Sequence, residues 1–194
     1  MYLTTIRLIL LVSIALVFNA GAQAQDPFFE RLAKVNALTK SGNEKIQKKD
    51  FDGAIRDFNE AIPEANPMPD NVKSGLYLSR SHAYEGKGDL DKALEDLNKA
   101  IKLQPNNVYA YQNRASLHKK RKEPDEALAD YSKAIKINSK FAFAYQGRGM
   151  LLLSQGKDAE AEADFAKYIE LFPEGKATLE KEIEKAKAER AAKP

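Results

Sequence analysis

Two short segments recur along this chain at matching intervals, and this periodicity constrains the fold more than any other feature. The first segment reads LTKSGNEKI, YLSRSHAYE, YQNRASLHK and YQGRGMLLL, starting at Leu38, Tyr77, Tyr111 and Tyr145. The second reads AIRDFNEAI, ALEDLNKAI, ALADYSKAI and AEADFAKYI, starting at Ala54, Ala93, Ala127 and Ala161. The numbers of both sets of starts increase by 39, 34 and 34, so one unit occurs four times. Such a repeat predicts a stacked array and not a globule with one central core.

Each unit has the pattern of two helices. In the second segment of the first unit, Ala54, Ile55, Phe58, Ala61 and Ile62 fall on one face of a helix. No alternating run rich in Val and Thr indicates a strand. We therefore expect helices at 28–48, 52–64, 71–86, 90–103, 107–121, 124–137, 141–154, 158–171 and 176–191.

A two-helix unit of this period, about 34 residues, resembles the tetratricopeptide repeat family. That family has small residues where the paired helices cross, and Gly42, Ser81, Ala115 and Gly149 here stand opposite the four alanines that start the second segments. It has a large apolar residue four positions after each alanine, supplied here by Phe58, Leu97, Tyr131 and Phe165. Tyr168 and Ser139 depart from the pattern, since the family usually has a small residue and a proline there. The resemblance implies an all-α fold, a right-handed α-solenoid of four helix-turn-helix repeats plus a C-terminal capping helix.

The resemblance also divides the chain. After a signal peptide at 1–24 we expect an N-terminal helix extension at 25–34 and a repeat domain at 35–175. The four repeats are 35–73, 74–107, 108–141 and 142–175, and the capping helix is 176–194. The first repeat carries five extra residues in a loop at 62–71, which we interpret as a stiff turn with a helix start at Asp70. Contact with a partner is the alternative for this loop.

The segment 1–24 differs from the rest of the chain and indicates export. Arg7 precedes an apolar run from Leu8 to Phe18, and small residues follow up to Ala24. This order is typical of a cleavable secretory signal, with cleavage after Ala24 preferred to cleavage after Ala22. An uncleaved anchor is the alternative, although the apolar run is well short of the roughly 20 residues that span a bilayer. We expect an exported protein without a membrane span after cleavage, periplasmic or secreted if bacterial.

The composition gives no indication of catalysis. The chain has no cysteine, which excludes thiol nucleophiles and thiolate metal sites, and its two histidines, His82 and His118, lie in different repeats. We find no catalytic constellation, and we expect a protein that is not an enzyme and has no cofactor and no metal. With 31 basic and 28 acidic residues the net charge is +3, which gives no case for nucleic-acid binding.

Two columns of opposite charge run through the repeats. Arginines stand at 80, 114 and 148, and aspartates at 57, 96, 130 and 164. Our hypothesis pairs each aspartate with the arginine of the following repeat, as Asp57–Arg80, Asp96–Arg114 and Asp130–Arg148. This would explain why the first repeat, which has no predecessor, has Ser41 in place of arginine. Pairing within each repeat is the alternative.

The resemblance implies that the first helix of each repeat lines a concave surface that holds a peptide or a partner's helix. The candidate binding residues are Asn43, His82, Tyr109, Gln112, Asn113, Ser116, Lys119, Phe143, Gln146 and Met150. For Tyr109 and Phe143, packing between neighbouring repeats is an equal alternative. Some family members clamp a partner's C-terminal carboxylate with lysine and asparagine, but Thr39 and Ser79 break that pattern here.

We therefore expect a scaffold or adaptor that binds a protein or peptide partner on the concave surface. The alternative is a self-associating structural component or part of an envelope complex, in which the protein forms a homo-oligomer.

Overall fold

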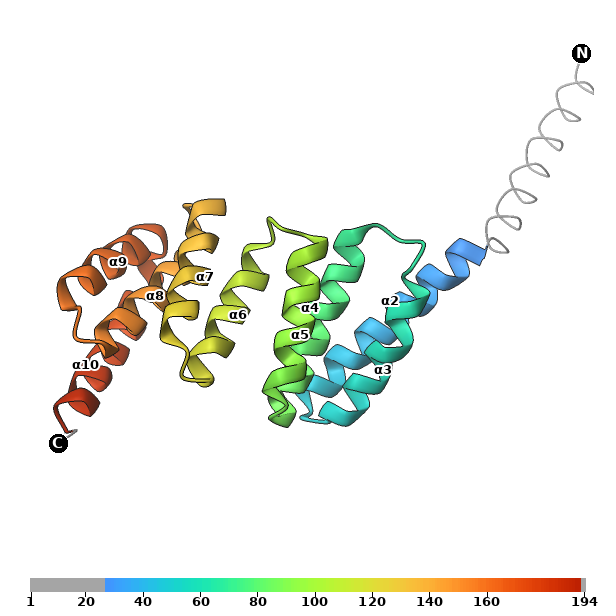
Figure 1. Cartoon of the computed structure of the whole chain (residues 1–194), viewed down its shortest axis with the longest axis horizontal. Helices are drawn as coiled ribbons and strands as arrows, with labels where there is room; N and C mark the ends of the chain where they lie inside the picture. The colour runs from blue at the N-terminus through green and yellow to red at the C-terminus, as the bar shows by residue number, and fades with distance from the viewer. Residues whose placement is uncertain (1–26, 193–194) are drawn as a thin grey trace, which may run out of the picture.

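The computed structural model describes residues 27–192, and these form an elongated row of paired helices (Figure 1). The elements are α2 (Pro27–Gln47), α3 (Phe51–Glu64), α4 (Asp70–Lys87), α5 (Leu90–Leu103), α6 (Val108–Lys120), α7 (Pro124–Ile137), α8 (Ala142–Ser154), α9 (Asp158–Leu171), the short 3₁₀ helix η1 (Pro173–Gly175) and α10 (Lys176–Ala191). The described residues contain no strand, so the all-α prediction is confirmed. The predicted helix ends agree with the observed ones to within a single position. The expected signal peptide lies outside the described residues.

Local chemistry explains where the helices begin and end. Asp50 and Asp89 cap α3 and α5 by accepting hydrogen bonds from the backbone N–H groups of Gly53 and Lys92. Gly88 ends α4 with φ of +86°, in the left-handed region that glycine enters without strain. These caps keep the turn between α4 and α5 short, so the two helices pack as a hairpin.

Small residues let the paired helices cross closely. A Cβ atom on Gly42 would lie 2.7 Å from the ring of Phe58, and one on Gly149 would lie 2.6 Å from the ring of Phe165. The alanines opposite, including Ala54 and Ala127, are fully buried. The crossing positions that the periodicity predicts are therefore the places where the helix pairs meet.

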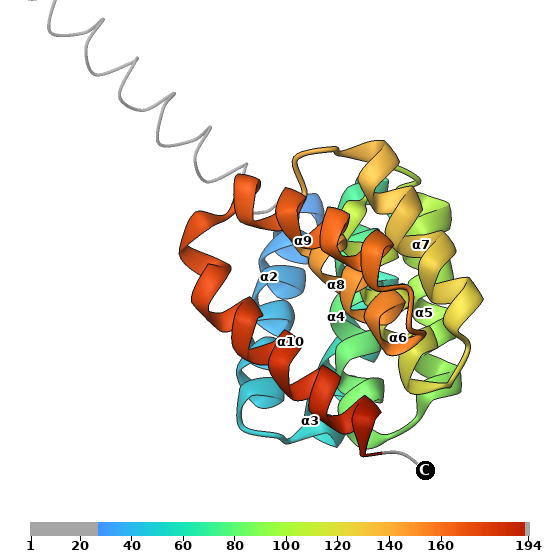
Figure 2. The same ribbon diagram turned by 90° about the vertical axis from the view of Figure 1, so that its left-hand side faces the viewer.

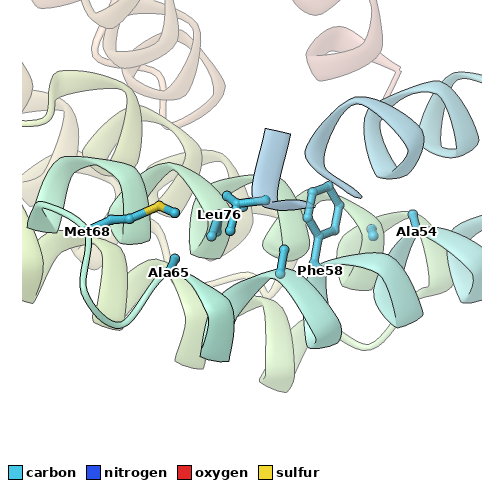
Figure 3. Close-up of a cluster of buried hydrophobic side chains, with 8 residues drawn as sticks. Ala54, Phe58, Ala65, Met68 and Leu76 are labelled. Carbon is cyan, nitrogen blue, oxygen red and sulfur yellow. The ribbon is translucent and has the colours of Figure 1, made fainter. Parts of the chain in front are cut away.

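The core is divided into clusters along the row. The first cluster joins repeats 1 and 2, with Phe58 and Leu76 packed together (Figure 3). It also contains Ala65 and Met68 from the inserted loop, both buried, and α4 begins at Asp70 as expected. The inserted loop is therefore packed into the core at its centre.

The ion pairs between the two charge columns lie within repeats, so the hypothesis of pairing between repeats is wrong. The pairs are Arg80–Asp96, Arg114–Asp130 and Arg148–Asp164, with Nε–Oδ2 distances of 2.7, 2.7 and 2.8 Å. In each pair Nη2 donates a second hydrogen bond to Oδ1, at 2.8, 2.8 and 2.7 Å. The carboxylates are buried, with exposed side-chain fractions of 2%, 8% and 7%. Each pair thus ties the first helix of a repeat to its own second helix.

The remaining guanidinium nitrogen makes the contact between repeats. Nη1 of the three arginines donates to Asn59, Asn98 and Ser132 of the preceding repeat, at 2.6, 2.7 and 3.0 Å. Each acceptor lies two positions after an aspartate of the column, on the second helix. Tyr77, Tyr111 and Tyr145 add ring contacts, since the guanidinium carbons lie 5.5, 5.6 and 5.9 Å from the ring centroids. We call this arrangement of arginine, aspartate and preceding acceptor the arginine clamp.

The first repeat replaces arginine by a different cation. Nζ of Lys45 lies 2.7 Å from Oδ2 of Asp57, and Lys45 stands one helical turn after Ser41 on α2. Burial acts to raise the pKa of Asp57, but hydrogen bonds from Lys45 and Ser41 lower it overall. Asp57 is therefore satisfied within its own repeat, without the arginine that in the later repeats also contacts the preceding repeat.

Double-mutant cycles will separate the two pairings. Arg80→Ala with Asp96→Ala should show a coupling energy of about 1–3 kcal/mol, because each single change leaves a charge without its partner. Arg114→Ala with Asp96→Ala should be additive within about 0.5 kcal/mol, because these residues belong to different clamps. The free energy of unfolding in urea is the measurement. Larger coupling for Arg114 with Asp96 than for Arg80 with Asp96 would contradict the clamp.

Candidate functional site

The candidate site is the outward side of the first helices α2, α4, α6 and α8, which we call the first-helix face. Figure 2 views the row nearly along its length, with α9 and α10 nearest the viewer. All ten predicted binding residues lie on these four helices, and each is at least partly exposed. The structure joins some of them directly and leaves others apart. Asn43 and Lys119 are exposed, and within the described part of the chain neither bonds to another candidate residue.

The middle of the face is connected by polar contacts between α4 and α6. Nε2 of His82 lies 2.6 Å from Nδ2 of Asn113, and Lys120 pairs with Glu85 at 2.5 Å. One side of His82 is open to solvent, but packing of the ring lowers its pKa by burial, against the smaller opposing effect of Glu85. The neutral ring accepts the hydrogen bond that the Asn113 amide donates. Repeats 2 and 3 therefore present one continuous polar surface.

Beside this polar surface stands a column of aromatic rings. Tyr109 and Phe143 are 59% and 45% exposed, and they occupy equivalent positions on α6 and α8. Both rings contact Phe141, with centroid distances of 5.2 and 6.2 Å. Phe143 also contacts Phe172 at 5.6 Å. The contact between Phe141 and Phe143 crosses from repeat 3 to repeat 4, as the alternative interpretation proposed for Phe143, whereas the contact of Tyr109 with Phe141 lies within repeat 3. Tyr109 and Phe143 still leave about half of their surface open.

The floor of the face between α6 and α8 is formed by Tyr131, which the sequence pattern assigned only to the helix crossing. Its hydroxyl lies 3.3 Å from Oγ of Ser116, and burial raises its pKa. A Cβ on Gly147 would lie 2.4 Å from the Tyr131 ring, so only glycine leaves room for that ring. Gly147 is the residue that could have revealed this in the sequence, because the equivalent positions of the other repeats carry the side chains of Lys40, Ser79 and Asn113.

At its C-terminal end the face is already covered. Gln146 donates a hydrogen bond to Glu182 of α10 at 2.9 Å, and Met150 packs against the cluster that contains Leu179 and Ile183 of α10. Sequence reasoning expected α10 to cover the last repeat, but it did not anticipate that these two candidate binding residues lie against it. The part of the face that remains open runs from α2 to Phe143.

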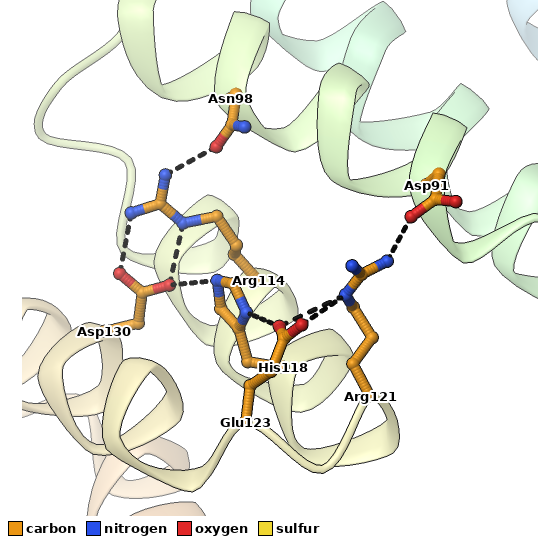
Figure 4. Close-up of polar contacts among 7 residues, drawn as sticks. All are labelled: Asp91, Asn98, Arg114, His118, Arg121, Glu123 and Asp130. Carbon is orange, nitrogen blue, oxygen red and sulfur yellow. Dashed lines mark hydrogen bonds and ion pairs between the residues drawn. The ribbon is translucent and has the colours of Figure 1, made fainter.

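At the turn between α6 and α7, a charged network joins repeats 2 and 3 (Figure 4). Nδ1 of His118 lies 2.7 Å from Glu123, and Arg121 contacts both Glu123 and Asp91. Hydrogen bonds from His118 and Arg121 lower the pKa of Glu123. Since Asp91 belongs to α5, the Arg121–Asp91 pair spans two repeats. Residues 119–122 are four consecutive basic residues. Arg121 belongs to this network, and Lys120 belongs to the first-helix face.

Residues 27–192 contain no group of three or more histidine or acidic side chains that could hold a metal ion. Within the same range, no helix combines the length and the apolar character that crossing a bilayer requires.

Stacked helix pairs with a continuous first-helix face define the chain as an α-solenoid, and comparison with known families identifies the repeat. A model described as TPR repeat matches residues 82–122, and two models described as tetratricopeptide repeat match residues 108–141 and 144–174. Residues 82–141 and 144–174 therefore carry tetratricopeptide repeats, as the sequence resemblance predicted.

Individual proteins share this repeat. The chain is 36% identical over 86 residues to "Small glutamine-rich tetratricopeptide repeat-containing protein 2" of Mycosarcoma maydis, over 44% of this chain. The match covers 23% of that relative and 16% of another, so the chain spans about a fifth of the length of the curated relatives that it matches.

Two solved structures extend the comparison. BtubC (BKLC) from P. vanneervenii superposes with a TM-score of 0.73 over 95% of this chain and 85% of its own, and its 18% identity shows a shared fold alone. The first TPR of Spaghetti (RPAP3), in a structure bound to the HSP90 peptide SRMEEVD, has 25% identity and a TM-score of 0.56. That match covers 63% of this chain and 96% of the other.

Gly147→Ala should destabilise the protein by about 1–3 kcal/mol, because the new methyl group would enter the space of the Tyr131 ring. Gly75→Ala is the matched control, since Gly75 lies on α4 and a methyl group there would meet nothing within 4 Å. The control should stabilise α4 by about 0.5–1 kcal/mol. Thermal unfolding of the two variants is the measurement, and equal effects would contradict the placement of Tyr131.

Proposed function

We propose that this protein is an interaction scaffold that binds an extended peptide or a partner's helix on the first-helix face. The site comprises the open candidate residues Asn43, His82, Tyr109, Gln112, Asn113, Ser116, Lys119 and Phe143. Recognition uses a surface that exists before the partner arrives, so little ordering of the protein is needed on binding.

The observation that carries this proposal is the half-open aromatic column beside a row of amides. Tyr109 and Phe143 are held by edge contacts to Phe141 and still expose about half of each ring. Gln112 and Asn113 lie on the same helix as Tyr109 and are partly exposed. Rigid aromatic rings next to adaptable amide groups suit a peptide, because the rings hold apolar side chains while the amides bond its backbone.

The comparisons support the same class of partner. The RPAP3 domain, which is similar in structure to 63% of this chain, was solved with a peptide bound. For the present chain we infer a peptide or protein partner of this general kind and no particular one. The C-terminal carboxylate clamp is not part of the proposal, because Thr39 and Ser79 interrupt its lysine and asparagine pattern.

Gln112→Ala with Asn113→Ala should weaken peptide binding about tenfold or more while the melting temperature changes little, because both side chains are partly exposed. A peptide selected by display against the wild-type protein is the probe, and its Kd is the measurement. Lys133→Ala with Lys136→Ala, exposed on α7, is the matched control and should leave the Kd unchanged. Equal loss in both variants would contradict the site, and a wild-type dimer that the first variant dissociates would favour self-association.

We also propose that the protein acts outside the cytoplasm, after removal of the segment 1–24. Arg7, the apolar run from Leu8 to Phe18 and the small residues up to Ala24 support this proposal. An exported chain meets partners in the periplasm or the surrounding medium if its source is bacterial.

Protein recovered from the exported fraction of its native cells should begin at Gln25, because a signal peptidase would cut after Ala24. N-terminal sequencing or intact mass identifies the new first residue. Replacing Ala22 and Ala24 by leucine should block processing and leave the apolar run attached. A native protein that retains Met1 would contradict the proposed export signal.

A further inference from the structure

The last helix does not continue the stack. Each of α4, α6 and α8 packs most against the second helix of its own pair and next against the second helix of the preceding pair, whereas α10 runs close to α8 and has little backbone contact with α9. Both ribbon views draw α8 between α9 and α10 (Figures 1 and 2). The tight corner at η1 turns the chain back at this point, with Gly175 buried against Tyr168 and Phe172. A helix in this position covers the first-helix face of repeat 4.

The contacts of α10 fall on the positions where a partner would bind. Gln146, Met150 and Leu153 stand one full repeat after Gln112, Ser116 and Lys119, so they occupy the same positions on the first-helix face. Glu182 accepts the hydrogen bond from Gln146, and Arg190 donates to the backbone oxygen of Leu153 at 2.8 Å. Leu153 is buried beside Leu179 and Ile183, while its counterpart Lys119 is exposed.

The hold on α10 combines one apolar stripe with an ion pair near its C-terminal end, where Arg190 donates two hydrogen bonds to Asp158 of α9, at 2.5 and 2.8 Å. Its buried or half-buried apolar residues are Leu179, Ile183 and Ala186, which lie on one helical stripe at i, i+4 and i+7. Most of its other side chains are exposed lysines, glutamates and alanines. A groove of about 330 Å³ remains between α9 and α10, lined in part by Phe165, Ile169 and Ile183. The helix is therefore held by this stripe, by the bond to Gln146 and by Arg190, and it leaves a groove open at the end of the array.

We propose that α8 is a docking surface for an amphipathic helix, that α10 is its intramolecular occupant, and that a partner's helix must displace α10 to bind there. The partner helix would carry an apolar stripe spaced like Leu179, Ile183 and Ala186, with a carboxylate opposite Gln146. This inference rests on the proposed function, because it takes the first-helix face to be the binding surface. It adds that the protein restricts one end of that surface by itself.

The short connection through η1, which tethers α10 to α8, explains why α10 stays bound to α8 in the isolated chain. A helix joined to its site by the few residues of η1 competes at an effective concentration in the millimolar range or above. A free helix of the same sequence therefore binds poorly while α10 is intact. Weakening the stripe of α10 should open the site without altering α8.

The test uses the full chain and a synthetic peptide of residues 176–192 with a fluorescent label. The protein variant Leu179→Ala with Ile183→Ala removes the stripe from α10 and leaves Gln146, Met150 and Leu153 unchanged. Anisotropy should show the wild-type peptide binding this variant at least about tenfold more tightly than it binds the wild-type protein. A peptide carrying the same two alanines is the matched control and should not bind the variant.

Hydrogen exchange provides a second test that does not require tight binding of the peptide. In the variant, amides of α10 and of α8 beneath it should lose protection while those of α6 and α7 keep it, and the wild-type peptide should restore protection to α8. Loss of protection throughout repeat 4, with no restoration by the peptide, would mean that α10 is only a structural cap and would overturn the inference. Equal peptide binding by both proteins would overturn it too. Neither result depends on Gln112 and Asn113, so failure here is distinguishable from failure of the proposed function.

Discussion

The bidentate contact between an arginine of each first helix and a buried aspartate of its second helix is the constraint on which the array depends. The carboxylates of Asp96, Asp130 and Asp164 are almost fully removed from water, so each requires its arginine. The same guanidinium uses its third nitrogen on the preceding repeat. One side chain therefore closes its own helix pair and sets where the previous pair lies, which fixes the spacing of the first-helix face.

Periodicity in the sequence predicted the helices well and their ionic contacts poorly. The repeat, the small crossing residues and the caps are local or periodic signals, so helix ends followed from them. Whether an aspartate pairs with the arginine of its own repeat or with that of the next repeat depends on how far the side chains extend. The spacing of the two columns in the sequence is the same for both pairings, so it does not distinguish them. Two residues held the missing information. Lys45 lies a turn from the absent arginine, and Ala166 replaces Asn59, Asn98 and Ser132 only in the last repeat, where no arginine follows.

At each end of the array, a glutamate stands where the other repeats have an apolar residue. Ala83, Leu117 and Leu151 are buried at one position of α4, α6 and α8, and the equivalent residue of α2 is the exposed Glu44. At the other end, Glu162 of α9 replaces Ile55, Leu94 and Leu128, which pack between repeats. A further helix pair stacked on either end would bury these carboxylates without partners, which is costly. Growth by end-to-end stacking is therefore disfavoured, which leaves the first-helix face as the surface that we propose for recognition.

That face was predicted residue by residue from its register, yet the register could not show which part of it is free. In the sequence, Gln146 and Met150 stand at positions that are exposed on the first helices of the other repeats. The helix that covers them, α10, lies outside the repeats, so the periodic pattern does not reveal it. Leu179, Ile183 and Ala186 form an apolar stripe that packs against the last repeat of the same chain. From the sequence, this stripe looks the same as one that binds a partner. Because η1 tethers α10 beside α8, the partner that we propose for Tyr109 and Phe143 would reach the face of repeat 4 only by offering more contact than α10 does.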